Sequence, residues 1–301
     1  MGARNRAPTA HNATLMDIFG GPSDDLRHYR TRGPSCISLS GGRTSGYQLA
    51  KILEAHDGVL PTDTHVVFAN TGFEHPGTLD FVEQISLRWG VDIVWVEYDG
   101  REGARDFREV THATAARAGE PFETLVGHKN ALPNVTSRFC TQVLKVERIR
   151  AFMRSRGYES WTDYVGLRAD EPRRVAKRRG ASDDEVTYAM PLSDAGVTKS
   201  DVLRFWRAQP FDLEIPWSAG NCTLCFEKRS GILLEELRRD PASAQRWRLL
   251  EERTGRTFTR GRPVRELERI ALIPPSQLTG RDRAIAEDLG DDEGRVCACT
   301  D

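Results

Sequence analysis

The sequence has no run of apolar residues that approaches the length of about 18 needed to cross a bilayer. Acidic and basic residues nearly balance, 44 against 43, so the net charge of −1 gives no overall attraction to nucleic acid or membrane. The first 34 residues lack the apolar segment of a secretory signal. We therefore expect a cytoplasmic protein with no membrane partner, whose six cysteines serve as thiols or metal ligands rather than disulfides.

Internal repeats and long low-complexity tracts are also missing. Hydrophobic residues make up 39% of the 301 residues, which is enough for the core of one large domain. The pattern changes after the polar N-terminal residues and again near residue 210, where charged, helical sequence begins. We predict an N-terminal arm at residues 1–34, a nucleotide-binding α/β domain at 35–210, and a helical appendage at 211–301.

Apolar runs and helical patterns alternate from residue 35 onward. Residues 36–39, 64–69 and 91–96 are short apolar runs typical of strands, and segments with apolar residues at helical spacing separate them. A β-α-β-α-β order forms a parallel sheet with helices on both faces. We predict a doubly wound, mostly parallel α/β sheet of Rossmann-like form, which binds ligands at the carboxyl ends of its strands.

The rest of the chain carries weaker patterns. Residues 101–137 are expected to form a helix and a loop at the sheet edge, and residues 141–156 a helix. Residues 161–167 (WTDYVGL) form a further expected strand, followed by a short helix at 200–209.

The sequence SGGRTS at residues 40–45 directly follows the first predicted strand. A glycine-rich turn there offers backbone N–H groups with little side-chain bulk, and it leads into the N-terminus of a helix. Both features favour a bound phosphate and therefore a nucleotide. Because such a turn is also common as a plain structural turn, the prediction depends on two further loops.

Those loops follow two other predicted strands. Residues 70–76 (NTGFEHP) combine polar side chains with a glycine, which allows close approach to a base or ribose. Residues 166–174 (GLRADEPRR) supply guanidinium groups suited to bidentate phosphate contacts. The basic run at residues 173–179 is either a solvated surface or a phosphate track for a nucleic acid substrate.

Taken in order, the motifs SGGxxS, NTGxExP and GxRxxExxR resemble those of the adenine nucleotide α-hydrolase (PP-loop ATP pyrophosphatase) superfamily. Within it, the chain most closely resembles the phosphoadenosine phosphosulfate (PAPS) reductase family, over about residues 35–230. The resemblance implies binding of ATP or a related adenine nucleotide. It also implies either cleavage at the α-phosphate to AMP and pyrophosphate, or reduction of an adenylyl sulfate.

The resemblance assigns roles to residues by position. It implies nucleotide contacts for the loop and for residues near the adenosine: Ser38, Ser40, Gly41, Gly42, Arg43, Thr44, Ser45, Asn70, Thr71 and Gly72. It implies four catalytic residues, two of which, Arg43 and Arg168, offset charge on the leaving pyrophosphate; the other two are Glu171 and Arg174. Relatives that hydrolyse ATP often have Lys-Asp in mid-loop, where the Asp helps to hold Mg²⁺. Here Thr44 takes that place and is a weaker metal ligand, so Mg²⁺ is expected elsewhere or is not needed by this loop.

Two cysteines, Cys222 and Cys225, form a C-x-x-C, a spacing that lets two thiolates bind one metal or cluster. A redox dithiol is the competing interpretation. Cys140 begins a predicted helix, whose dipole favours a thiolate. Cys36 lies in the first predicted strand and is expected to be a buried small hydrophobe.

Residues 138–145 (RFCTQVLK), followed much later by the C-x-x-C, resemble the ligand pattern of iron–sulfur members of the PAPS reductase family. This implies a 4Fe–4S cluster with four thiolate ligands: Cys140, Cys222, Cys225 and Cys299. The fourth ligand is alternatively Cys297, or the cluster keeps an open iron, as in sulfur-transfer relatives that act on tRNA. The reductases usually carry two adjacent cysteines at the first position, and this chain has one. The C-x-x-C is also compatible with a structural zinc ion or with no metal at all.

We therefore expect an enzyme that couples adenine nucleotide cleavage to iron–sulfur-dependent sulfur transfer. Its partners would be a sulfur donor or reductant protein and an acceptor, with nucleic acid among the candidates. A second hypothesis is a reductase of adenylyl sulfate or PAPS that gives sulfite, although the tail at residues 296–301 lacks the Gly and His of the reductase motif. A third is a non-catalytic nucleotide-binding or nucleic-acid-binding protein. The acceptor and the oligomeric state stay open.

Overall fold

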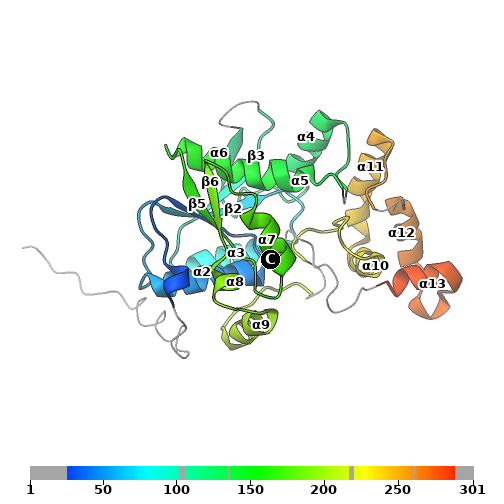
Figure 1. Ribbon diagram of the computed structural model, residues 1–301. Coiled ribbons are helices and arrows are strands. Elements are labelled where there is room, and N and C mark those ends of the chain that lie inside the picture. Colours follow the sequence, from blue (N-terminus) through cyan, green and yellow to red (C-terminus); the bar gives the residue numbers. More distant parts are fainter. Residues whose placement is uncertain (1–25, 102–105, 135, 217–219, 260–261, 289–301) are drawn as a thin grey trace, which may run out of the picture.

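A single sheet forms the centre of the protein in the computed structural model, which describes residues 26–101, 106–134, 136–216, 220–259 and 262–288. Within these residues, six strands pair in the order β4-β3-β2-β1-β5-β6 (Figure 1). The strands are β1 (Ser35–Ser38), β2 (Thr64–Asn70), β3 (Ile93–Tyr98), β4 (Phe107–Val110), β5 (Trp161–Val165) and β6 (Val186–Ala189). Neighbouring strands are parallel except for β3 and β4, which pair antiparallel. The predicted mostly parallel α/β sheet is confirmed.

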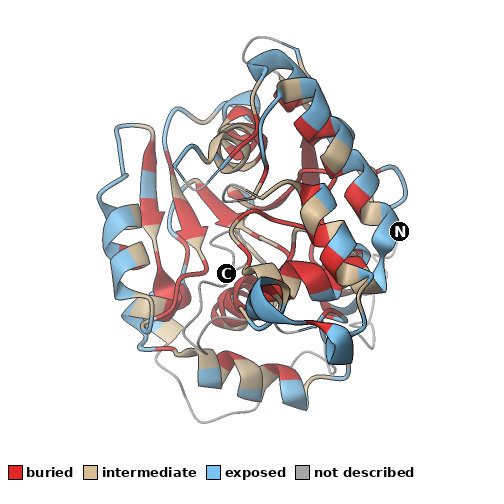
Figure 2. Ribbon diagram, turned by 90° about the vertical axis from the view of Figure 1, so that its right-hand side faces the viewer, coloured by how far each residue is buried: buried red, intermediate tan, exposed pale blue. Residues whose placement is uncertain are grey.

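Alternate residues of the central strands face two different layers of helices. Ile37 lies in the core that β1 and β2 share with α2 (Arg43–Ala55), α3 (Pro76–Trp89) and α9 (Lys199–Ala208). Its neighbour Cys36 lies in the opposite core, with α6 (Glu147–Ser155) and α7 (Pro172–Arg179). Neither side chain is exposed, as expected for a strand covered on both faces, and Figure 2 shows the strands largely buried. The prediction that Cys36 is a buried hydrophobe is confirmed.

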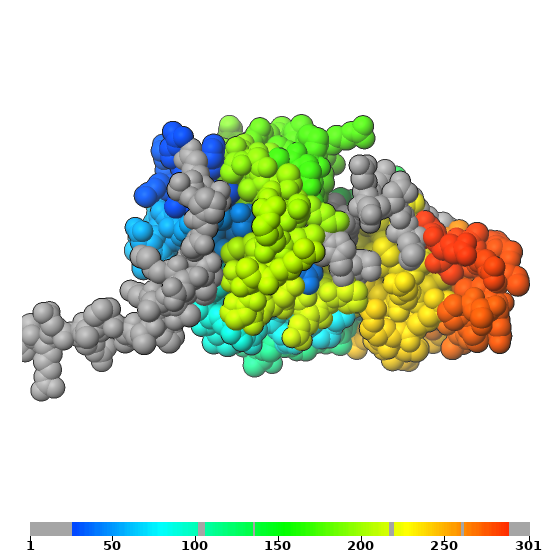
Figure 3. Space-filling model, turned by 90° about the horizontal axis from the view of Figure 1, so that it is seen from below, coloured from blue at the N-terminus to red at the C-terminus, as the bar shows by residue number. Residues whose placement is uncertain are grey.

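A third core joins the C-terminal helices to the loop after β2. These helices are α10 (Ser230–Arg239), α11 (Ala244–Thr254), α12 (Val264–Ala271) and α13 (Gly280–Ala286), and α4 (Glu120–Lys129) packs with them. Phe73 of the loop stacks on Trp247 of α11, with ring centroids 4.5 Å apart. Figure 3 shows these C-terminal helices, coloured yellow to red, grouped at one end of the molecule. The helical appendage therefore contacts the sheet domain through aromatic packing.

Shorter elements complete the described chain: η1 (Leu26–Tyr29), α5 (Phe139–Thr141), η2 (Gln142–Val146), α8 (Pro191–Asp194), η3 (Pro241–Ser243) and η4 (Pro275–Gln277). Residues 1–25 of the predicted arm lie outside the described residues, whereas Tyr29 at its end is buried. Across the described ranges, no helix is both long and apolar enough to cross a membrane.

Two local predictions need correction. Residues 107–110, expected in a helix and loop region, form the antiparallel edge strand β4 instead. Four half-exposed residues carry too little periodicity for the strand to be predicted, and pairing with β3 decides their conformation. The helix expected at residues 141–156 is present, but its first part, η2, is a π-helix. Such π segments are frequent at functional sites, and this one lies beside the pockets described next.

Candidate active site

The glycine-rich turn after β1 has the backbone shape that the sequence predicted. Gly41 has a φ of +81°, and a Cβ there would lie 2.5 Å from the Cγ2 atom of Thr78, so only glycine fits without a shift. Helix α2 begins directly after the turn, and its N-cap residue, Gly42, provides no side-chain cap. The free backbone N–H groups at the N-terminus of α2 can therefore bind an anionic group such as a phosphate.

Two serines close this turn from inside. The Oγ atoms of Ser40 and Ser45 lie 2.9 Å apart, and the Ser40 backbone N–H donates to the Ser45 Oγ at 3.1 Å. These hydrogen bonds hold the two ends of the turn together.

A pocket of about 500 Å³, here termed the large pocket, lies at the carboxyl ends of β1, β2 and β5. Ser38, Ser40 and Ala69 line it from the first two strands and the turn. The strand order changes direction at β1, which has β2 on one side and β5 on the other. Open α/β sheets bind ligands at such a switch point, and the volume suits a nucleotide.

Five cationic side chains line the large pocket: Arg138, Lys145, Arg174, Lys177 and Arg178. The last three come from α7, where spacings of three and four residues place them on neighbouring turns of the helix. The Arg178 guanidinium also lies over the Tyr188 ring, 4.8 Å from its centroid. The basic run therefore turns part of its charge toward a cavity, which favours an anionic ligand over a purely solvated surface.

One acidic residue lines the large pocket among the described residues, and the sequence did not single it out. The Oδ1 atom of Asp163 accepts a hydrogen bond from the Ser38 Oγ at 2.7 Å. Burial raises the pKa of Asp163 to about 6, although the Ser38 bond and the charges of Arg178 and Arg150 act to lower it. The available signal was a carboxylate within the otherwise strand-like run WTDYV.

Of the four residues expected to be catalytic, Arg174 lines the large pocket. The Arg43 guanidinium instead donates to Asp212 at 2.8 and 3.0 Å and to the Leu213 carbonyl at 2.6 Å. Glu171 forms an ion pair with Arg174 and accepts a hydrogen bond from the Arg168 backbone N–H at 3.1 Å.

Arg168 is buried and ties the loop after β5 to the start of α2. Its Nη1 donates to the Thr44 Oγ1 at 2.9 Å and its Nε donates to Asp170 at 2.9 Å. Because Thr44 is 3% exposed and its hydroxyl already holds Arg168, that hydroxyl does not fit a Mg²⁺ ligand. We therefore assign no Mg²⁺ site to this loop.

The residues expected near the adenosine shape the loop after β2. Asn70 is fully buried, and its side chain donates to Glu97 at 2.6 Å and to the Ala116 carbonyl at 2.9 Å. Its Oδ1 accepts from the Gly72 backbone N–H at 3.0 Å, in a turn where Gly72 has a φ of +84°. Thr71 lines a second pocket rather than the large one.

This second pocket, here termed the cysteine pocket, brings together three of the four expected metal ligands: Cys140, Cys222 and Cys225. Aromatic side chains surround it: Phe73, Phe122, Phe226, Trp247 and Phe258. Its open volume of about 30 Å³ is much smaller than that of the large pocket. The fourth expected ligand, Cys299, and Cys297, which could replace it, lie outside the described residues.

Three cysteines from distant segments line one pocket in an apolar, aromatic setting. Within the described residues, however, no three Cys, His, Asp or Glu side chains are grouped as ligands of one metal ion.

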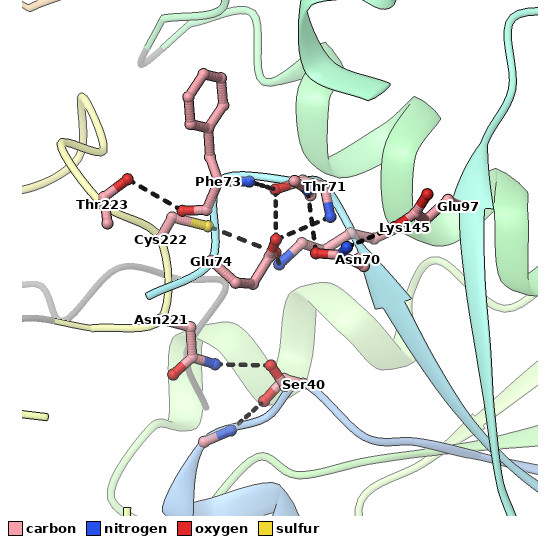
Figure 4. Close-up of polar contacts among 12 residues, drawn as sticks. Ser40, Asn70, Thr71, Phe73, Glu74, Glu97, Lys145, Asn221, Cys222 and Thr223 are labelled. Carbon is pink, nitrogen blue, oxygen red and sulfur yellow. Dashed lines mark hydrogen bonds and ion pairs between the residues drawn. The ribbon is translucent and has the colours of Figure 1, made fainter. Parts of the chain in front are cut away.

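The C-x-x-C segment is fastened to both nucleotide loops (Figure 4). Glu74 and Cys222 form an isolated antiparallel bridge, and the Thr223 N–H donates to the Phe73 carbonyl at 2.8 Å. The Asn221 side chain donates to the Ser40 carbonyl at 2.7 Å. Asn221 therefore links the glycine turn to the cysteine segment. No sequence motif predicted this contact.

Two residues of the π-helix region, Thr141 and Lys145, line both pockets. The Lys145 ammonium lies 3.3 Å from the Glu74 Oε1, and Glu74 is buried. The other oxygen of Glu74 accepts from the Thr71 N–H at 2.9 Å and the Thr71 hydroxyl at 2.8 Å. The large pocket and the cysteine pocket are thus neighbours with one shared cationic wall.

Comparison with known proteins identifies a family and several similar proteins. Residues 34–214 match the family model of the phosphoadenosine phosphosulfate reductase domain. The chain is 34% identical over 199 residues to the uncharacterized nin region protein ORF290 of Escherichia phage lambda, covering 64% of this chain and 65% of that protein. It is 29% identical over 181 residues to an uncharacterized 37.8 kDa protein of Escherichia phage 186, covering 50% of this chain and 53% of that protein.

A crystal structure of phosphoadenylyl-sulfate (PAPS) reductase from Candida auris, in a phosphate complex, is similar at a TM-score of 0.40 and 13% identity. That match covers 70% of this chain and 92% of the other. The chain spans less than two thirds of the length of either phage relative.

Proposed function

Because the chain belongs to the phosphoadenosine phosphosulfate reductase domain family, we propose that it is an enzyme that cleaves an adenine nucleotide beside a thiol centre. The nucleotide, ATP or a close relative, would occupy the large pocket. The observation that carries the proposal is the shared wall: Thr141 and Lys145 line both the large pocket and the cysteine pocket. A reaction that uses a phosphate leaving group and a sulfur nucleophile requires that proximity.

The phosphates would lie on the glycine turn and the uncapped start of α2. Lys145, Arg138 and Arg174 would then offset the charge that develops on the departing pyrophosphate. Arg168 and Glu171 would act as positioning residues, since they hold the loop after β5 against Thr44. Arg43, held by Asp212, would fix the first turn of α2.

The proposed chemistry has two balanced steps. An oxygen of the acceptor attacks the α-phosphorus of ATP, and pyrophosphate leaves, so that the acceptor carries AMP through that oxygen. A hydrosulfide from a sulfur donor then attacks the activated carbon of the acceptor, and AMP leaves with the oxygen. The acceptor gains sulfur in place of oxygen, and neither step requires an oxidant or a reductant.

Cys140, Cys222 and Cys225 would hold a 4Fe–4S cluster, with Cys299 or Cys297 as a fourth ligand or an open iron in its place. In such a cluster different sulfurs bind different irons, so the three cysteines need not converge on one metal ion. When bound, such a cluster supplies a site for sulfur or for electrons next to the nucleotide.

The test is an anaerobic purification of the full chain, followed by iron and sulfide counts and an assay for AMP and pyrophosphate from ATP. We expect iron and sulfide in nearly equal amounts, and ATP turnover that depends on an added acceptor. Sulfite from adenylyl sulfate or PAPS, without pyrophosphate from ATP, would instead support the reductase that the family description names. A colourless zinc protein that binds no adenine nucleotide would overturn both.

A further inference from the structure

The large pocket has a marked division of charge. Five cations line it, and Asp163 is its one acidic lining residue within the described part of the chain. Asp163 is 8% exposed, so the side chain is held in the wall of the cavity rather than in solvent. A carboxylate in a phosphate-binding pocket repels phosphates. It therefore has to face a part of the ligand that carries no negative charge.

The fold fixes where this carboxyl lies. In the sheet register, Asp163 of β5 lies between Cys36 of β1 and Tyr188 of β6. It precedes the end of β5 by two residues, and the glycine turn begins beyond the end of β1. Asp163 is thus set back from the phosphate-binding turn, deeper along the strands.

Part of the pocket wall is apolar and suits an aromatic base, although the charges of Arg178 and Arg150 also act on Asp163. Ala69, Val165 and Ile149 line the pocket with apolar surface. Ser38 is the hydrogen-bond donor that the described residues offer to the carboxyl, and it uses Oδ1. The structure gives the second oxygen no hydrogen bond with the described residues, and Asp163 lines the pocket, so this oxygen is available to accept from a donor of the ligand.

We propose that Asp163 accepts a hydrogen bond from the exocyclic amino group of the nucleobase and so makes the large pocket selective for adenine. The proposal rests on the proposed function, because it takes the large pocket as the nucleotide site. The N6 amino group of adenine is an uncharged donor at the end of the nucleotide remote from the phosphates, which matches the position of Asp163 relative to the glycine turn.

The experiment compares two ligands that differ only in this amino group: ATP and purine riboside 5′-triphosphate. Their dissociation constants for the full chain are measured by calorimetry at about pH 8, above the Asp163 pKa of about 6. A hydrogen bond to a charged group predicts at least about tenfold tighter binding of ATP. Because both ligands carry the same triphosphate, the ratio of their dissociation constants isolates the contribution of the amino group on the base.

Variants assign the effect to Asp163. In D163A the ratio of the two dissociation constants is expected to fall to within about twofold. D163N is also expected to lose the selectivity, because its one oxygen accepts from Ser38 and its amide N–H groups would then face the N6 amino donor. The control D194N removes a carboxylate that pairs with Arg179, and it should leave the ratio unchanged. Because D163N keeps the size and the Ser38 acceptor, it serves if D163A does not fold.

The outcomes separate the two proposals. Equal binding of both ligands by the unaltered protein, or an unchanged ratio in D163A, overturns the role of Asp163 and leaves the nucleotide pocket standing. If neither ligand binds, the proposed function fails, and the role of Asp163 fails with it.

Discussion

The Cys222 thiol lies 3.9 Å from the Glu74 Oε1, and the backbones of the two residues pair in an antiparallel bridge. The same carboxylate oxygen is 3.3 Å from the Lys145 ammonium. Glu74 therefore stands between a thiol of the cysteine pocket and a cation of the large pocket (Figure 4). A change in the charge or position of groups in either pocket therefore alters the contacts of the buried Glu74 carboxylate. For this reason we expect nucleotide binding and thiol chemistry to depend on each other.

Substitution of Lys145 tests the shared wall. K145M keeps the length of the side chain but removes its charge, so we expect the nucleotide dissociation constant to rise about tenfold and AMP formation to fall about 100-fold. K129M, at an exposed lysine in the last turn of α4, should match the unaltered protein. Calorimetry and an AMP assay measure the two effects. Full activity in K145M would show that the two pockets work without this cation.

The glycine turn offers a matched pair of alanine substitutions. Gly33 and Gly41 both have positive φ, but a Cβ at Gly33 would meet nothing within 4 Å, whereas one at Gly41 would meet Thr78 at 2.5 Å. G33A should lose about 1 kcal/mol of unfolding free energy, and G41A about 2 kcal/mol or more. Denaturant titration checks the difference. Only G41A should also weaken ATP binding, and equal effects in both variants would argue against a tightly packed turn.

The cysteines of the described residues divide into three proposed cluster ligands and one core thiol. C140S, C222S and C225S are each expected to lose most of the bound iron and sulfide, because serine is a poor ligand for iron–sulfur clusters. C36A changes a thiol with no exposed surface in β1 and should keep the full metal content. Metal analysis of anaerobically purified protein gives the answer. Loss of iron in C36A but not in C222S would contradict the assignment.

The sequence predicted the sheet because β1, β2 and β3 carry apolar runs of their own. It did not predict β4, since Phe107–Val110 becomes a strand only through its pairing with β3. Among candidate site residues, the three cysteines converge on one pocket, and Ser38 and Arg174 line the other. The cysteines and Arg174 belong to motifs with fixed spacing, which a single sequence can show.

Other parts of the site depend on contacts between distant segments. Asp163 is polar within an apolar strand, and its place in the pocket follows from pairing of β5 beside β1. Asn221 reaches Ser40 only because the chain returns to the turn after α9. The ion pair between Arg43, which the sequence placed near the phosphates, and Asp212 also joins segments that are distant in the sequence. The sequence alone cannot show which of several possible partners a side chain contacts, because the distances between residues far apart in the chain are set only by folding.

The raised pKa of Asp163 makes stability depend on pH in a definite direction. In the unfolded chain the carboxyl ionises near its ordinary pKa of 3.8, but in the folded protein it ionises near 6. The unfolded state therefore loses its proton first as pH rises, and the folded state is disfavoured by up to about 3 kcal/mol above pH 6. D163N does not titrate. Its unfolding free energy relative to the unaltered protein should thus rise by about that amount from about pH 4 to about pH 7.

Thermal or urea unfolding at several pH values measures this difference. D194N, which removes a half-exposed carboxylate, serves as the control and should show a much smaller trend. A flat difference between D163N and the unaltered protein would mean that the Asp163 carboxyl is well solvated in the folded state.

The C-x-x-C turn is held by a buried ion pair behind it. Leu224, between the two cysteines, has a φ of +42°, which is unfavourable for a residue with a branched side chain. Its backbone N–H donates to the Glu236 Oε2 at 2.9 Å, and the other oxygen of Glu236 binds the Lys228 ammonium. Lys228 and Glu236 are both buried, so each charged group has lost its contact with water and is stabilised by the other.

A double-mutant cycle of this pair tests whether it sets the geometry of the cysteine pocket. E236Q keeps an oxygen for the Leu224 N–H but leaves the Lys228 charge buried without its partner, so we expect a loss of about 3 kcal/mol or more. K228M removes that charge and leaves Glu236 charged, at a similar cost. The double variant buries no charge, so it should be about 2 kcal/mol more stable than the two single losses together would give. Since the double variant still offers an acceptor to Leu224, it should retain the iron content. E236L, which offers none, should lose iron even where it stays folded, and equal iron in both variants would mean that the turn holds its shape without this hydrogen bond.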